Sequence, residues 1–190
     1  RILRELRSDV LDHYDCFTVG ETAMVDVDEA RDLCNPARRE LDMVIYFEHL
    51  EVDRRVARYI PRRFKAGKLL QVYTKWQQGL DWNALYLESH DQPRIVSHYG
   101  DDRRYRARSA KMLATMQFTL RGTPFLYQGQ ELGMTNFDFT RLDQLKDVES
   151  FNIDKLMQSK HIPKALRWRW IRQSSRDNAR TPMQWTDGPG

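Results

Sequence analysis

Four short apolar runs, spaced so that a helix fits between each pair, constrain the fold of this chain more than any other feature. A strand with one solvent-exposed face alternates apolar and polar residues, and these runs do not. Both faces of each predicted strand should therefore be covered, as in a parallel sheet. They begin 27, 41 and 41 residues apart, which leaves room for a crossover helix each time. The runs cover residues 16–19, 43–47, 84–87 and 125–127.

Helical patterns lie between these runs. Apolar residues recur at helical spacing in residues 69–80 and 109–120, and Gly122 and Pro124 follow the second segment. Strands that alternate with helices indicate βαβ units, and four units are about half of a (β/α)8 barrel of ~250 residues. A doubly wound sheet is the alternative, but the glycine-rich phosphate turn it favours is absent after the first run. The predicted fold class is therefore α/β, a half barrel.

Composition excludes several classes of protein. The 190 residues are 41% hydrophobic, yet no apolar run approaches the roughly 20 residues of a membrane span, and no signal-peptide pattern appears. Two cysteines, Cys16 and Cys34, fit neither a disulfide framework nor a zinc site and favour a reducing, cytoplasmic location. The basic run 54–68 contains Pro61 and Gly67 and matches no nucleic-acid module, so we expect a solvated face and no nucleic-acid partner.

A carboxylate stands at or just past the end of every run. The strand ends of a (β/α) barrel open on one face, so these acids should meet at one mouth, although any single one could instead cap a helix. Glycoside cleavage needs two carboxylates in different environments. We predict that burial raises the pKa of Glu21, and that Asp91, between His90 and Arg94, stays ionised. The carboxylates are Glu21, Glu48, Glu88, Asp91 and Glu131.

Metal chemistry is not expected. The five histidines include no His-x-x-x-His pair, and no other residues have ligand spacing. A lone histidine is ordinarily structural, but the position of His90 beside Asp91 favours a role in binding. We therefore predict neither a metal ion nor a cofactor.

Four long motifs carry a family resemblance. They are FTVGE around Glu21, WNALYLESHDQPRIVSHYG from residue 82, RGTPFLYQGQELGMTN from residue 121 and RDNARTPMQW from residue 176. Together they resemble glycoside hydrolase family 13, the alpha-amylase family, in its branch of oligo-1,6-glucosidases, dextran glucosidases and trehalose-6-phosphate hydrolases. The resemblance implies a catalytic (β/α)8 barrel that cleaves with retention of anomeric configuration.

The resemblance also implies a role for each matching residue. Glu21 matches the general acid/base, and Asp91 matches the aspartate that binds sugar hydroxyls and stabilises the transition state. His90 matches a histidine that hydrogen-bonds the same sugar ring. Arg176 matches the arginine that holds the non-reducing end of the substrate, which implies release of one glucose at a time.

Two departures from the family pattern limit what this chain should do alone. Ser89 stands where the family usually has Asn, a change beside the site. The family's nucleophile, an aspartate that ends the fourth barrel strand, has no counterpart here. Because the chain also begins with Arg1, we expect a piece of a longer protein whose N-terminal half completes the barrel. Residues 1–135 would supply strands five to eight, and residues 136–190 an irregular, partly helical extension.

The predicted activity is hydrolysis of short α-1,6- or α-1,4-linked gluco-oligosaccharides by exo action, with the isolated chain inactive. A glucosyltransferase or a sucrose isomerase of the same family stays open as an alternative. A non-catalytic relative is less favoured, because Glu21 and Asp91 are both present. The expected partner is a small oligosaccharide, and its linkage and phosphorylation are left open.

Overall fold

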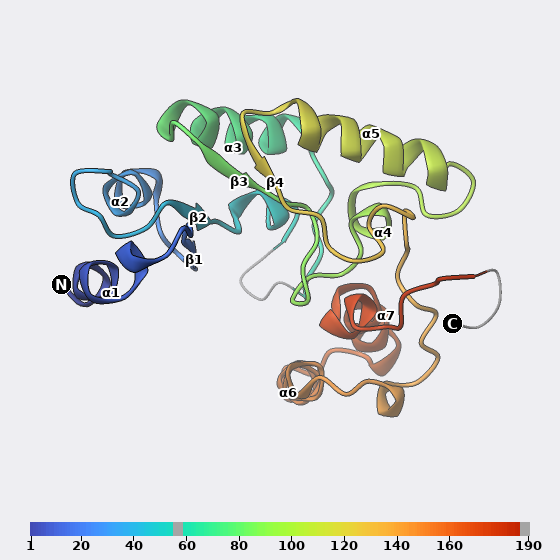
Figure 1. The fold of residues 1–190 in the computed structure, drawn as a ribbon. Helices are drawn as coiled ribbons and strands as arrows, with labels where there is room; N and C mark the ends of the chain where they lie inside the picture. Colours follow the sequence, from blue (N-terminus) through green and yellow to red (C-terminus); the bar gives the residue numbers. More distant parts are fainter. Residues whose placement is uncertain (55–58, 187–190) are drawn as a thin grey trace. The chain divides into compact units, whose positions relative to one another are not determined.

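The computed structural model describes residues 1–54 and 59–186. Their Cα atoms group into two compact units. Figure 1 shows the chain coloured from its N-terminus to its C-terminus, with helices and strands labelled. The strand unit comprises residues 1–52, 65–85 and 119–125. The helical unit comprises residues 53–64, 86–118 and 126–190.

The elements alternate between strands and helices as far as β4 and are helical beyond it. Their order is α1 (Ile2–Asp9), η1 (Leu11–His13), β1 (Val19–Glu21), α2 (Val27–Leu33), β2 (Met43–Ile45), η2 (Glu48–Leu50), α3 (Ala66–Gly79), β3 (Asn83–Leu85), α4 (Ile95–Tyr99), α5 (Arg106–Thr119), β4 (Gly122–Pro124), η3 (Leu142–Gln144), α6 (Val148–Ser159), α7 (Lys164–Ser174) and η4 (Arg176–Ala179).

The strand unit is built from two parallel strand pairs, as the apolar runs predicted. Strand β1 pairs with β2, with Val19 opposite Met43, and β3 pairs with β4, with Asn83 opposite Gly122. Strand β2 also lies beside β3. Among the described residues these four strands form two parallel pairs and do not close a barrel.

Two predicted strands are displaced along the chain. Strand β1 begins at Val19 rather than at residue 16. The Thr18 carbonyl still accepts the Met43 amide of β2 at 3.0 Å, but the amide and hydroxyl of Thr18 bond the Asp42 carboxylate at 2.7 and 2.9 Å. Strand β4 covers Gly122–Pro124 rather than 125–127. Gly122 has φ +152°, and a Cβ there would overlap the carbonyl oxygen of Asn83. The tight approach of β4 to β3 therefore depends on a residue without a side chain.

Helices α2 and α3 pack on the core of the strand unit. Asp26 and Glu29 form a capping box that begins α2. The apolar stripe predicted in residues 69–80 is buried in α3, and Trp76 stacks on Tyr46 with ring centroids 3.9 Å apart. The core consists of Ala30, Val44, Tyr46, Val72, Trp76 and Leu80.

The helical unit has its own core, in which α6 and α7 pack together. Its buried apolar residues are Tyr59, Phe139, Leu145, Met157 and Ile171. Arg54, predicted to be solvated with the basic run, is instead buried and donates to the Ser174 hydroxyl at 2.6 Å. Arg55 and Arg58 lie outside the described residues, and Arg62 to Lys68 is largely exposed.

Over the parts of the chain that are described, no helix combines the length and apolarity that a bilayer crossing requires.

Candidate active site

Asp91 lies in a turn that follows β3. The turn is closed by the Gln92 amide, which donates to the Ser89 carbonyl at 3.2 Å, and the Asp91 amide donates to the Ser89 hydroxyl at 3.1 Å. A serine or asparagine at this position can accept such a local bond. Ser89, the departure from the family pattern, therefore orients the Asp91 backbone in this chain.

Two guanidinium groups contact one oxygen of Asp91. Arg176 Nη1 donates to Asp91 Oδ1 at 3.1 Å, and Arg180 Nη2 donates to the same oxygen at 2.8 Å. Arg180 also donates from Nε to the His90 carbonyl at 2.9 Å. The His90 imidazole is exposed, with Nε2 3.4 Å from Asp91 Oδ2. Residues nearly ninety positions apart in sequence thus meet around one carboxylate, and three of the four predicted site residues, His90, Asp91 and Arg176, lie together.

The predicted cationic partner of Asp91 is wrong. Arg94 is turned away and buried, and its Nη1 donates to Glu88 Oε2 at 2.9 Å and to the Gln128 carbonyl at 2.8 Å. Glu88 Oε1 accepts the Ile95 amide at 2.9 Å. Burial raises the pKa of Glu88, while the bonds from Ile95 and Arg94 act in the opposite direction. Glu88 and Arg94 therefore fix the loop from inside.

Asp147 binds the Arg176 guanidinium through two hydrogen bonds, and this residue was not predicted from the sequence. Nε and Nη2 donate to the two carboxylate oxygens of Asp147, each at 2.7 Å, and Glu149 Oε2 lies 3.3 Å from Nε. The hydrogen bonds from Arg176 lower the pKa of Asp147, and Asp147 raises the pKa of Arg176 in return. We call Asp91, Asp147, Arg176 and Arg180 the Asp91 cluster.

Arg180 was also missed, although a signal was present. It lies four residues after Arg176 in the motif RDNAR, at the C-cap of η4, and two arginines so close in sequence can reach the same partner. Asp147 gives a weaker signal, because an aspartate before a helix ordinarily indicates an N-cap, and Asp147 does cap α6 by accepting the Glu149 amide at 3.2 Å.

Glu21 is the last residue of β1 and belongs to the strand unit, so the structure does not bring it together with the Asp91 cluster inside one unit. Its side chain is exposed, which contradicts the burial that was predicted for it. Glu48, another predicted strand-end acid, pairs with Lys75 at 2.7 Å and accepts from Trp76 at 2.9 Å. Glu48 therefore has a structural role.

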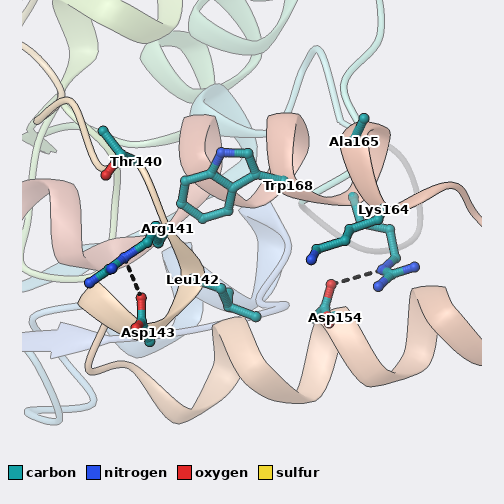
Figure 2. A pocket seen from close by; sticks show the side chains of 9 residues that line it. Thr140, Arg141, Leu142, Asp143, Asp154, Lys164, Ala165 and Trp168 are labelled. Atoms are coloured by element: carbon teal, nitrogen blue, oxygen red, sulfur yellow. Dashed lines mark hydrogen bonds and ion pairs between the residues drawn. The ribbon is translucent and has the colours of Figure 1, made fainter.

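A separate hollow of about 720 Å³ lies in the helical unit between η3, α6 and α7 (Figure 2). The Trp168 indole lies in it, with the ion pairs Arg141–Asp143 and Arg167–Asp154 at its rim. Its lining includes no member of the Asp91 cluster.

Across residues 1–54 and 59–186, no group of three His, Cys, Asp or Glu side chains could hold a metal ion.

Parallel strands that alternate with helices, and a carboxylate in the turn after a strand, are features of (β/α) barrel enzymes. The catalytic-domain model of the alpha-amylase family matches residues 1–190. The chain therefore belongs to the alpha-amylase family, and it folds as part of a (β/α)8 barrel.

Individual relatives agree with this assignment. The chain is 43% identical over 189 residues to an oligo-1,6-glucosidase of Halalkalibacterium halodurans, a match that covers 97% of this chain and 34% of that protein. Trehalose-6-phosphate hydrolase of Bacillus licheniformis has a similar structure, with a TM-score of 0.90, 42% identity and coverage of 98% and 34%. Isomaltulose synthase of Klebsiella gives a TM-score of 0.92 at 38% identity with the same coverage. The chain thus spans about a third of the length of these relatives.

Proposed function

We propose that this chain is part of a retaining α-glucosidase that releases glucose from short α-1,6- or α-1,4-linked gluco-oligosaccharides. The observation that carries the proposal is the Asp91 carboxylate, which lies beside His90 in the turn after β3 and is contacted by two arginines. A partly exposed carboxylate in such a position can stabilise the positive charge of an oxocarbenium-like transition state. Similarity to a protein named oligo-1,6-glucosidase supports the substrate class.

In this proposal each predicted residue has a defined step. Glu21 donates a proton to the leaving glycosidic oxygen and then removes a proton from the attacking water. Its exposed position at the end of β1 allows proton exchange with solvent. Asp91 and His90 bind the hydroxyls of the ring being cleaved, and Arg176 holds its non-reducing end.

The proposal assigns the nucleophile to another part of the protein. A retaining mechanism needs a second carboxylate about 5–5.5 Å from the acid/base. We propose that residues 1–135 contribute barrel strands five to eight, that residues 136–190 form the extension after strand eight, and that an N-terminal half of the barrel supplies the nucleophilic aspartate.

We also propose a cytoplasmic location, which the two free thiols of Cys16 and Cys34 favour.

Hydrolysis of p-nitrophenyl α-glucoside tests this function. The whole protein that contains this chain should release p-nitrophenol, whereas the purified 190-residue chain should not, because it lacks the nucleophile. Absence of turnover by the whole protein would refute the glucosidase. Turnover by the 190-residue chain would refute the assignment of the nucleophile to another segment.

Sucrose isomerisation is a second candidate, favoured by the TM-score of 0.92 against isomaltulose synthase. Both reactions can share one glucosyl-enzyme intermediate, and the acceptor decides between them: water gives hydrolysis and fructose gives an isomer. Product analysis after incubation with sucrose separates the two. Free glucose and fructose support hydrolysis, and a dominant disaccharide product supports isomerisation.

A further inference from the structure

Arg180 directs two donors of its guanidinium at two consecutive residues of the turn after β3. Nε donates to the His90 carbonyl at 2.9 Å, and Nη2 donates to Asp91 Oδ1 at 2.8 Å. A guanidinium is planar and its donors keep fixed directions, so two such bonds also fix their acceptors relative to each other. The Asp91 carboxylate is thereby tied to the main chain of the residue that carries the neighbouring imidazole.

The backbone that carries Arg180 is itself held by buried bonds. The Arg180 amide donates to the Asp177 carbonyl at the end of η4, at 3.1 Å. The Asp177 carboxylate accepts two backbone amides just before α6, at 2.7 and 3.0 Å. The buried side chain of Asn178 donates to the carbonyls of Arg172 and Ser175 at 2.9 and 3.0 Å. Segment η4 is therefore a fixed base from which Arg180 reaches the turn.

Arg176, the other arginine at Asp91, is anchored differently. Its Nε and Nη2 donate to Asp147, each at 2.7 Å, and its Nη1 donates to Asp91 at 3.1 Å. The paired bonds of Arg176 thus go to the start of α6, whereas the paired bonds of Arg180 go to the turn itself. Of the two arginines, Arg180 is the one whose geometry sets the direction of the Asp91 carboxylate.

We propose that Arg180 is a positioning residue that holds Asp91 and the main chain of His90 in the arrangement that binds the sugar ring. Arg180 acts through these two residues, so its task requires no contact with the substrate. The inference rests on the proposed function, since it assigns Arg180 a part in binding that sugar.

The substitution Arg180→Lys in the whole protein tests the inference. Lysine keeps the charge, but its ammonium group cannot present the same fixed pair of donors. We expect kcat/KM for p-nitrophenyl α-glucoside to fall by roughly 10- to 100-fold, the scale of a displaced positioning group. Part of this fall should be a rise in KM of about threefold or more, because groups that bind the sugar are displaced. A mere loss of folded protein would lower the apparent kcat and leave KM unchanged.

The matched control is Arg172→Lys. Arg172 contacts Asp138 at 3.1 Å, and its side chain is 40% exposed, close to the 36% of Arg180. Because exposed pairs contribute little, this variant should keep kcat/KM within about twofold of the wild type.

A double-mutant cycle shows whether Arg180 acts through Asp91. Asp91→Ala removes the carboxylate that Arg180 positions, so adding Arg180→Lys to it should lower kcat/KM much less than Arg180→Lys does in the wild type. A fully additive loss, or an unchanged KM in Arg180→Lys, would overturn the inference while the wild type still hydrolyses the substrate. An inactive wild type would instead overturn the proposed function and the inference with it.

Discussion

At the residue scale, the carboxylates that follow β3 lie in two different surroundings, one partly exposed and proposed to bind substrate, the other buried and holding the loop. Asp91 is partly exposed and contacts Arg176 and Arg180, whereas Glu88, three residues earlier, pairs with Arg94 in the interior. Both carboxylates follow the same strand. Only Asp91 is accessible to a substrate, so the two acids have different roles because their surroundings differ.

Replacing the two proposed catalytic acids should separate activity from folding. In the whole protein, Glu21→Gln removes the group that protonates the leaving oxygen, and Asp91→Asn removes a charge that stabilises the transition state. We expect kcat to fall by roughly 10²- to 10⁴-fold in each, with an unchanged circular dichroism spectrum. Near-normal kcat in either variant would contradict the role assigned to that residue.

Candidate site residues that belong to long motifs could be named from the sequence, but the contacts between them could not. His90, Asp91 and Arg176 were found from motif and position, and the structure brings them together. The pairing of Asp91 with Arg94 was wrong because closeness in sequence does not decide which way a side chain turns at a strand end. Asp147 was missed because its contact with Arg176 spans 29 residues and leaves no local pattern.

At the scale of elements, periodicity predicted the helices better than the strands. The stripe of residues 69–80 became α3 within a few residues, since amphipathic spacing reflects burial directly. Strand β4 was displaced because Gly122 and Pro124 are depleted in strands, yet the backbone at Gly122 approaches β3 closely. The units themselves could not be foreseen, because each is assembled from segments distant in sequence.

The loop between β3 and α4 depends on a buried ion pair. Arg94 and Glu88 are 0% and 1% exposed, so Arg94→Met would leave a buried carboxylate without its charge partner. We expect a loss of roughly 3–5 kcal/mol in the free energy of unfolding, measured in urea. Arg172→Met is the control, because Arg172 and its partner Asp138 are 40% and 89% exposed and such pairs contribute about 0–1 kcal/mol. Equal losses in the two variants would show that the buried pair does not hold the loop.

At the scale of the whole molecule, the chain is a catalytic-domain segment that spans about a third of its relatives. Family membership and the partial barrel are established by the comparisons. We propose beyond this that the whole protein cleaves with retention of configuration, using a nucleophile from another segment.

The anomer that the whole protein releases first tests that claim most directly. Proton nuclear magnetic resonance, recorded within minutes of adding p-nitrophenyl α-glucoside, whose only sugar product comes from the cleaved bond, distinguishes α-glucose from β-glucose before mutarotation mixes them. A double displacement through a glucosyl-enzyme intermediate predicts α-glucose as the first product. β-Glucose as the first product would mean a single displacement by water and would contradict the account.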